Sequence, residues 1–420
     1  MGRVRGHRTP RPRRPAHAVE RHRRRTRPHM STRIIAAVGD VLVERAHPER
    51  ALDAVRPVLD AADLVLGNFE GVLTDTHPVA PGMTASTVVA TANAAPLAAF
   101  DVLSLANNHA MDAGHGGLTD TVAALAAQGV TTVGAGRNIA EALRPAVLPV
   151  GRTGIAVVAC ASVLPVGAQA GPATPGVAPL RAQDCYTAPL PGHICPGVPA
   201  KVVSVLDEQD WAAVEKAVTA VRDRAGLVVV SVHWGDHTRP WVITEHERFC
   251  AELLAGAGAD LVLGHHHHLW RGAEFLGDTP VLYGLGHLVF DMPRFADELR
   301  SHGAQLDDVS PAGLEAAFGT YGFYPRPGDD PAHPFHPSSR ITAVALVEID
   351  DDGGAIGRCG LVPCLIGRDG TPRPVGRDDP RWDDVLAHFR SAMTEPRLTT
   401  QVVDRGETIR GFPLVTLERA

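Results

Sequence analysis

Five short polar segments hold the side chains of this chain that could do chemistry. Each one follows an apolar run, and they are Val-Gly-Asp at 38–40, Gly-Asn-Phe-Glu at 67–70, Ala-Asn-Asn-His at 106–109, Val-His-Trp-Gly at 232–235 and Gly-His-His-His-His at 264–268. A strand that is apolar on both faces is buried, and α/β proteins place their sites at the carboxyl ends of such strands. We therefore expect Asp, Glu, Asn and His to converge at one sheet edge. Nitrogen and oxygen donors that converge in this way predict a divalent metal site.

The elements that must position these motifs alternate between strands and helices. In the first part of the chain we predict strands over 31–43, 63–67, 102–105 and 130–133, with helices over 48–60, 93–100 and 116–128 between them. Further on we predict strands over 155–162, 227–233, 261–264, 280–285 and 288–290, with helices over 207–224 and 244–256. This succession predicts a largely parallel sheet with right-handed crossovers.

Two stretches lack such a pattern, and the end of the chain regains it. Residues 163–200 and 292–340 are rich in Pro and Gly, and a long loop of this kind is a lid, a substrate wall or a disordered insert. An alternating strand over 341–350, followed by Asp-Asp-Gly-Gly and a second strand over 361–366, predicts a hairpin. A final helix is predicted over 382–393.

The charge of the chain is unevenly distributed. The 420 residues carry a net charge of −7, although residues 1–29 contain eleven Arg and one Glu, which leaves −17 for the remainder. An acidic body argues against nucleic-acid binding. We expect 1–29 to be a disordered basic tail, or upstream sequence if translation starts at Met30. A basic arm or a twin-Arg export signal is the alternative, but the only nearby apolar run carries the first motif.

The remaining bulk properties describe an ordinary globular protein. We expect residues 30–420 to form one domain of mixed α/β class. The six cysteines include no Cys-x-x-Cys pair, and free thiols fit a cytoplasmic chain. No apolar run approaches the roughly 18 residues that a membrane span needs. We therefore expect a cytoplasmic protein without a membrane partner; its oligomeric state stays open.

The order of the motifs resembles the CapA family of bacterial capsule and poly-γ-glutamate synthesis proteins, within the calcineurin-like metallophosphatase superfamily. The run Leu-Ala-Asn-Asn-His-Ala-Met-Asp at 105–112 is the most specific part. The resemblance implies a four-layer α/β/β/α metallophosphatase-like sandwich. Its core would span 34–290, and a C-terminal extension over 291–420 would contain the β-hairpin and the last helix.

The resemblance also implies roles for individual residues. The metal ligands would be Asp40, Glu70 in the place of the bridging acid, Asn108 through its amide oxygen, His233, His266 and His268. His109 would be the general acid or the group that stabilises the transition state. His265 and His267 leave the register of the last motif ambiguous by one residue, although alternation along a strand would let only two of the four histidines face one site. One or two divalent ions are implied, and Mn, Zn, Fe, Mg and Ca all suit such donors.

Three positions depart from the usual metallophosphatase pattern. Leu42 stands where a His is usual, Glu70 where an Asp is usual, and His287 where the family usually has Asn. The first two weaken the interpretation as a di-metal phosphatase. His287 adds an ionisable group near the site.

These observations favour a metal-dependent enzyme that acts on a peptide or poly-glutamate-like substrate, with metal-assisted hydrolysis as the preferred reaction. The first alternative is metal-assisted epimerisation at a peptide Cα in a ribosomal natural-product pathway, with Asp40 or His287 as the acid or base. The second alternative is a non-catalytic accessory protein of capsule or polymer synthesis.

Overall fold

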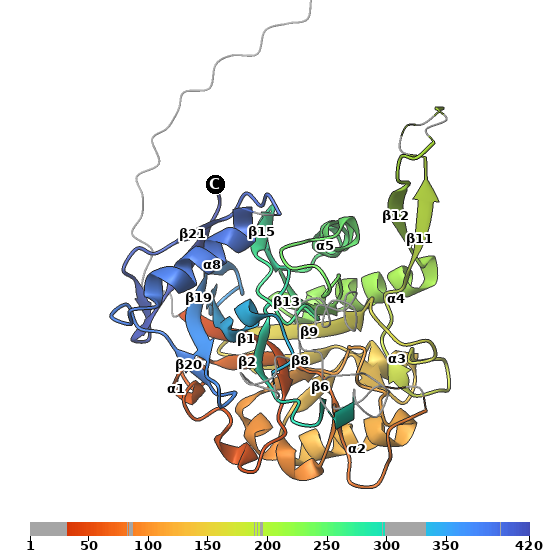
Figure 1. Ribbon diagram of the computed structural model, residues 1–420, viewed down its shortest axis with the longest axis horizontal. Helices are drawn as coiled ribbons and strands as arrows, with labels where there is room; N and C mark the ends of the chain where they lie inside the picture. The colour runs from red at the N-terminus through yellow and green to blue at the C-terminus, as the bar shows by residue number, and fades with distance from the viewer. Residues whose placement is uncertain are drawn as a thin grey trace, which may run out of the picture. The chain divides into compact units, whose positions relative to one another are not determined.

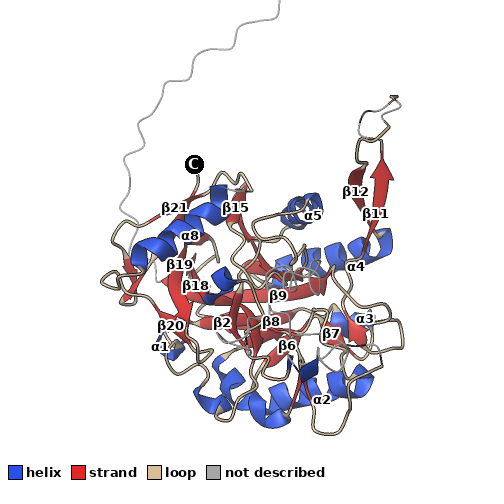
Figure 2. Ribbon diagram, viewed as in Figure 1, coloured by secondary structure: helices blue, strands red, loops and turns tan. Residues whose placement is uncertain are grey.

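Two β-sheets pack face to face around a shared core and carry helices on their outer faces (Figure 1, Figure 2). The computed structural model describes residues 32–420, except 82, 84–86, 189, 191, 194–195, 296, 299–332 and 395. The predicted basic tail at 1–29 and most of the predicted irregular stretch at 292–340 lie outside these residues. The mixed α/β class predicted from the sequence is confirmed.

The larger sheet has ten strands. They are β1 (Thr32–Leu42), β2 (Leu64–Phe69), β5 (Val102–Ser104), β6 (Thr131–Val133), β17 (His287–Phe290), β18 (Ile341–Asp350), β19 (Ile356–Ile366), β20 (Pro372–Pro374), β21 (Gln401–Val403) and β24 (Val415–Glu418). Strands β1, β2, β5 and β6 are neighbours and run parallel, as predicted. Strand β18 pairs antiparallel with β1 and with β19, which confirms the C-terminal hairpin and places it in the same sheet as the first motif.

The smaller sheet has six strands, and its side chains alternate between two cores. The strands are β8 (Ala146–Val150), β9 (Thr153–Ala161), β13 (Leu227–His233), β14 (Leu261–His265), β15 (Ala273–Leu276) and β16 (Thr279–Leu282). Val157 and Val229 belong to the core that is shared with the ten-stranded sheet. Their neighbours Val158 and Val230 pack on the opposite face with helices α4 (Glu208–Thr219) and α5 (Glu245–Gly256). This sheet is therefore buried on both faces, which explains its continuous apolar runs.

The helices follow their local sequence signals. Besides α4 and α5 they are η1 (Pro48–Arg50), α1 (Arg56–Leu59), η2 (Thr91–Ala99), α2 (Gly114–Ala127), α3 (Ile139–Ala142), η3 (Arg222–Arg224), η4 (Pro337–Arg340) and α8 (Trp382–Thr394). Thr244 and Glu247 form a capping box at the start of α5. The predicted single helix over 48–60 is wrong, because Pro48 and Pro57 lie in the first turns of two separate short helices, where a missing N–H is tolerated.

Short strands complete the fold and correct one prediction. They are β3 (Val72–Leu73), β4 (Val88–Val89), β7 (Ala135–Gly136), β10 (Gly176–Val177), β11 (Ala182–Thr187), β12 (Lys201–Leu206), β22 (Thr408–Ile409) and β23 (Phe412–Pro413). Strands β11 and β12 form a two-stranded hairpin that projects from the body in Figure 1. Part of the stretch at 163–200 is thus regular structure. The sequence pattern did not reveal it because every residue of β11 is exposed and no apolar alternation is needed.

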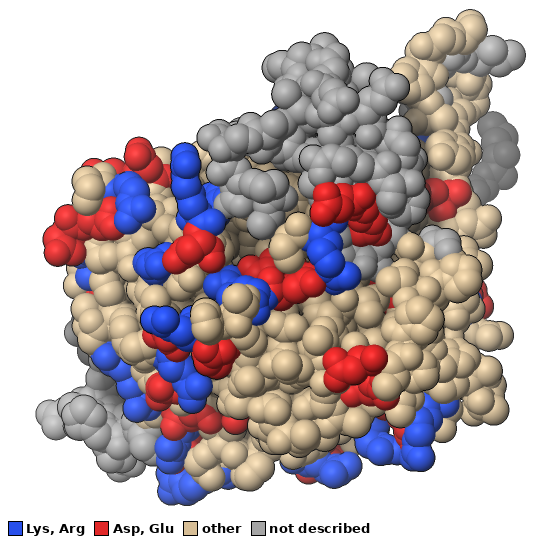
Figure 3. Space-filling model, turned by 60° about the horizontal axis from the view of Figure 1, so that its bottom comes forward, with Lys and Arg blue, Asp and Glu red and all other residues tan. Residues whose placement is uncertain are grey.

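The described surface carries mixed charge on the face drawn in Figure 3, where basic and acidic side chains lie interspersed. Several of the described arginines bridge two acids, as Arg33 does with Asp63 and Asp351. None of the described helices is both long enough and apolar enough to cross a membrane.

The carboxyl end of β1 contacts the segment before β17 without space for an additional atom. A Cβ on Gly39 would lie 1.9 Å from the carbonyl oxygen of Gly286, and the backbone N–H of Asp40 donates to the same oxygen at 3.0 Å.

We expect Gly39→Ala to force the strands apart and to lower the free energy of unfolding by about 1–3 kcal/mol. Thermal unfolding measures this. Gly256→Ala at the end of α5, where an added Cβ would meet no described atom within 4 Å beyond its own helix turn, is the control and should leave the melting temperature unchanged or slightly raised. Equal melting temperatures for both variants would contradict the close contact.

Candidate metal centre

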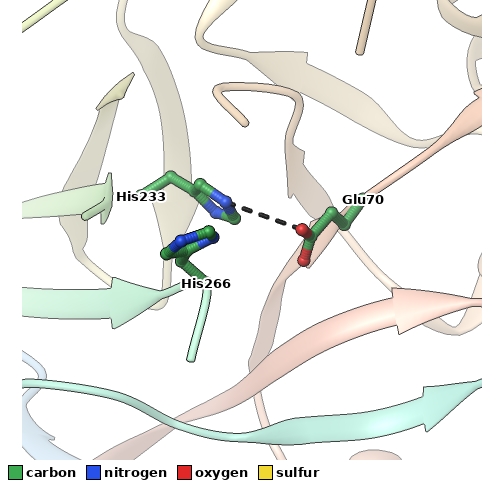
Figure 4. A group of neighbouring side chains, drawn as sticks. All are labelled: Glu70, His233 and His266. Carbon is green, nitrogen blue, oxygen red and sulfur yellow. Dashed lines mark ion pairs between the residues drawn. The ribbon is translucent and has the colours of Figure 1, made fainter. Parts of the chain in front are cut away.

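The carboxyl ends of strands from both sheets bring the polar motifs to one buried point. Asp40 lies near the end of β1, Glu70 follows β2, His233 ends β13, and His266 and His268 follow β14. None of these five residues is more than 6% exposed. Figure 4 shows Glu70, His233 and His266 pointing toward one another from different strands. Convergence at strand ends is thus present, but the strands belong to two sheets, whereas the sequence pattern predicted one sheet edge.

The five side chains form two groups that share one acid. Glu70, His233 and His266 each place one donor atom within 4.8 Å of the others, and Asp40, Glu70 and His268 do the same. His233 Nε2 lies 3.6 Å from Glu70 Oε1, and His268 Nδ1 lies 3.4 Å from Asp40 Oδ2. Glu70 belongs to both groups. The geometry accommodates an ion in either group, with the Glu70 carboxylate between them.

The polar atoms of the cluster are buried without the partners that such atoms need. Both carboxylate oxygens of Glu70 and the Nδ1 atoms of His233, His266 and His268 have no hydrogen-bond partner among the described residues. A buried, unpaired charge is costly unless an opposite charge compensates it. A divalent cation in either group would compensate the charge of Glu70 and bind the ring nitrogens that face it. The residues therefore fit the metal that the motifs predict.

Burial also sets the protonation of the cluster in the absence of an ion. Burial raises the pKa of Glu70 well above its usual value, and the negative charge of Asp40 raises it further. Burial lowers the pKa of His233 well below its usual value, and it does the same for His266 and His268. Neutral imidazole is the form that binds metals. The site therefore holds its histidines in the protonation state that an ion requires.

The carboxylate of Asp40 is held in one orientation. Its Oδ1 accepts a hydrogen bond from Asn68 Nδ2 at 2.8 Å and lies 3.4 Å from His265 Nδ1, while Oδ2 faces His268. The backbone N–H of His266 also donates to Oδ2, at 3.3 Å. Burial by itself would raise the pKa of Asp40, but the contacts with His265 and His268 outweigh burial and lower it. Asp40 is thus an anion with one oxygen directed at the cluster.

The Asn-Asn-His loop faces the same point. Asn108 Oδ1 lies 2.6 Å from His233 Nε2. His109 Nδ1 lies 2.6 Å from Asp112 Oδ2, which also accepts from the Thr87 hydroxyl at 2.6 Å. His109 Nε2 lies 3.9 Å from Glu70 Oε1, and its side chain is 24% exposed. Asp112 therefore orients the His109 ring, whose other nitrogen faces the cluster.

The four consecutive histidines face different surroundings, but not through the strand alternation expected from the sequence. Strand β14 ends at His265, and the backbone then takes positive φ angles of 97° at His266 and 54° at His268. Left-handed residues in this loop, rather than a pleat, direct His266 and His268 to the cluster. His267 turns away, and its Nε2 lies 2.9 Å from Glu247 Oε1 on α5.

Of two further residues beside the cluster, sequence reasoning left His265 open and missed His237. His265 is the register partner of His233 on the neighbouring parallel strand, so both side chains point to the same face. His265 is two and four residues after Leu263 and Leu261 on the same strand, so the three side chains lie on one face. This alternation could have indicated His265 from the sequence. His237 Nδ1 lies 2.9 Å from His266 Nε2. No local pattern indicates that contact, which joins residues from two loops.

His287 lies next to the cluster but in neither group. It is the register partner of Asp40 on β17 and is fully buried. Its ring centroid lies 5.7 Å from that of His268 and 4.8 Å from that of Phe335. Burial, with the nearby His333 and Arg340, lowers its pKa well below the usual value. The catalytic role predicted for His287 stays a prediction.

Comparison with known proteins identifies the family of this chain. Residues 34–292 match the family described as bacterial capsule synthesis protein PGA_cap, and the chain belongs to that family. It is 29% identical over 268 residues to the PGA biosynthesis protein CapA of Bacillus subtilis (strain 168), which covers 60% of this chain and 62% of that protein. It is 28% identical over 307 residues to the capsule biosynthesis protein CapA of Bacillus anthracis, with 66% of each chain covered. The match to the first of these relatives therefore spans less than two thirds of its length.

The chain is also similar to a mycobacterial protein and to one solved structure. A probable polyglutamine synthesis accessory protein of Mycobacterium tuberculosis (strain H37Rv) is 32% identical over 241 residues, covering 55% of this chain and 56% of that protein. Among solved structures, a novel phosphatase from Mycoplasma pneumoniae aligns over 84% of this chain and 97% of its own, with a TM-score of 0.44 and 10% identity.

Removal of the charge of Glu70 should abolish ion binding, because this carboxylate belongs to both groups. We expect Glu70→Gln to lose the rise in melting temperature that Mn²⁺ or Zn²⁺ gives to the chelator-treated wild type. Elemental mass spectrometry of the purified proteins measures the ion content directly. Glu141→Gln is the control, because it removes the same charge from a glutamate on α3 that pairs with Arg137. This variant should bind ions like the wild type. Equal ion content in Glu70→Gln and Glu141→Gln would contradict the assignment.

The ion-free protein should lose stability on acidification from about pH 7.5 to about pH 5.5. His233, His266, His268 and His287 have lowered pKa values, so the unfolded chain binds protons below about 6.5 that the folded chain does not bind. Glu70 acts in the opposite direction, because its raised pKa makes the folded state the one that holds the proton above 4.5. Four histidines outweigh one acid. Thermal unfolding after chelation measures the trend, and a melting temperature that rises on acidification would contradict it.

Proposed function

We propose that this chain is a metal-dependent hydrolase of a peptide or poly-glutamate-like substrate, with a metallophosphatase-like core over 34–290 and a C-terminal extension over 291–420. One observation carries the proposal: both oxygens of the buried Glu70 carboxylate lack hydrogen-bond partners in the described structure and face two sets of metal-binding side chains. Family membership supports the same conclusion. The printed names of the Bacillus relatives, which concern PGA and capsule biosynthesis, suggest the substrate class.

Each residue of the site has a definite task in this proposal. One ion would be held by Asp40, Glu70 and His268, and the other by Glu70, His233 and His266 with the Asn108 oxygen beside them. When bound, the ions would supply Lewis acidity toward the carbonyl or phosphoryl oxygen of the substrate and lower the pKa of a bound water. Everything else depends on side chains that position these ligands or move a proton.

His109 is the residue suited to proton transfer. Its Nδ1 contacts the Asp112 carboxylate at 2.6 Å, so the ring is oriented and its Nε2 faces the cluster. A histidine oriented by a carboxylate is a common arrangement for general acid–base catalysis. We assign His109 the delivery of a proton to the leaving group. Since its side chain is 24% exposed and the ligands of the two groups are buried, the substrate would approach from the His109 side.

The reaction can be tested on the ion-loaded protein in deuterated water. Poly-γ-glutamate is the first substrate, its chain length followed by size-exclusion chromatography and deuterium at Cα by mass spectrometry. We expect the polymer to shorten, and we expect His109→Asn to slow this about 100-fold or more while its ion content stays unchanged. His115→Asn, which makes the same change at an exposed position on α2, should retain the wild-type rate.

Other outcomes separate the alternatives. Deuterium at Cα in a polymer that keeps its length would contradict hydrolysis and favour epimerisation. Neither change, on this polymer or on a panel of acidic peptides, would leave an accessory role in polymer synthesis. Equal rates for His109→Asn and His115→Asn would remove His109 from the mechanism.

A further inference from the structure

We propose that His237 is a positioning residue that determines which nitrogen of His266 binds an ion, and that it supports one of the two ion positions without affecting the other. The inference rests on the proposed metal centre. It concerns a residue outside the five polar motifs, and it predicts that the two positions can be separated by mutation.

The contact between His237 and His266 assigns the nitrogens of both rings. His237 Nδ1 lies 2.9 Å from His266 Nε2, and the rings meet edge to face with centroids 4.6 Å apart. His266 Nδ1 is buried, and no described residue forms a hydrogen bond with it. A neutral imidazole that binds an ion through Nδ1 carries its single proton on Nε2, so Nε2 must donate. His237 Nδ1 is then the acceptor, and the His237 ring carries its proton on Nε2.

The loop that carries His237 is held by a buried cation. Arg271, which is 1% exposed, donates to the carbonyl oxygens of Asp236, Arg239 and Val242 at 2.9, 2.5 and 3.0 Å. The loop therefore has three anchors on one guanidinium group, and His237 lies next to the first of them. This arrangement gives the hydrogen bond to His266 a fixed geometry, as ligand-orienting residues require.

The chain just before His237 lies directly against a second buried pair. Gly235 has a φ angle of 87°, and a Cβ at this position would lie 2.2 Å from His267 Nε2 and 2.7 Å from the Glu247 carboxyl group. Only glycine therefore fits at position 235. The backbone on both sides of His237 thus has close contacts, at Gly235 with this pair and at Asp236 with Arg271.

His266 depends on this support because its backbone is unfavourable. Its φ angle of 97° lies in a region that non-glycine residues rarely adopt. Two contacts hold it there: the ring bond to His237, and the bond from its backbone N–H to Asp40 Oδ2 at 3.3 Å. Without His237 the ring would lose the contact that orients it through Nε2.

The other ion position has different support. The group of Asp40, Glu70 and His268 is oriented through the Asp40 carboxylate, which contacts Asn68 at 2.8 Å and His265 at 3.4 Å. Loss of His237 should thus weaken one ion and leave the second in place. Loss of a ligand-orienting residue typically lowers metal affinity 10–100-fold.

The test measures ion binding to the full chain, not activity. Chelator-treated protein is titrated with Mn²⁺ by calorimetry, and Co²⁺ absorption spectra report the ligand field. We expect two ions in the wild type. In His237→Gln we expect one unchanged ion and one weakened about 10–100-fold, because the Gln oxygen cannot occupy the Nδ1 position. In His237→Asn the side-chain oxygen can take the place of Nδ1, so both ions should bind nearly as in the wild type. Asn68→Ala should weaken the other ion.

The outcomes distinguish this inference from the metal centre itself. Two ions bound equally by His237→Gln, His237→Asn and the wild type would overturn the role of His237 and leave the metal centre intact. Equal weakening of both ions in His237→Gln would overturn the separation of the two positions. Wild-type binding by Glu70→Gln would overturn the metal centre. Thermal unfolding of each ion-free variant shows whether it is folded. His237→Asn and His237→Gln are compared with each other because both keep an amide side chain at position 237 and differ by one methylene group.

Discussion

The buried carboxylate of Glu70 is the constraint on which the site depends. A carboxylate without a partner in a low-dielectric interior must gain a proton or acquire an opposite charge. Burial and the neighbouring Asp40 accordingly raise its pKa. The surrounding histidines have lowered pKa values and remain neutral, so they do not supply that charge. A divalent ion bound by Glu70 and the neighbouring imidazoles would supply that charge, and this is why the arrangement is interpreted as a metal centre rather than as a network of ion pairs.

The backbone around the cluster leaves the ligands little freedom. A Cβ on Gly264 would lie 2.0 Å from the carbonyl oxygen of Tyr283, and one on Gly39 would lie 1.9 Å from that of Gly286. Strand ends from both sheets are therefore in direct backbone contact with the chain that follows β16. The positive φ angles of His266 and His268 add local strain, which the contacts of their side chains offset. Strain at a site supported by a rigid scaffold is consistent with a functional role for both residues.

The two groups of ligands are not equivalent. Leu42 packs in the apolar core, so β1 offers only Asp40 to the first group. Here Asn68 and His265 orient the carboxylate, whereas His237 orients His266 in the second group. The difference gives each position its own ligands and its own supporting residues around the shared Glu70.

The sequence by itself determined the parts of this protein that depend on short-range pattern. Apolar runs that end in Asp40, Glu70 and His233 indicated buried strands with polar ends, because a strand buried on both faces must be apolar along its length. The C-terminal hairpin and α8 followed in the same way from alternation and helical spacing. Tertiary structure decided the rest. The roles of His265, His266, His267 and His268 depend on left-handed backbone angles after β14, and the contact of His237 with His266 joins two loops. The projecting hairpin of β11 and β12 buries no face of β11 and so left no apolar pattern. Contacts between distant segments, and backbone angles set by those contacts, have no periodic signature in a sequence, and for that reason only the folded chain reveals them.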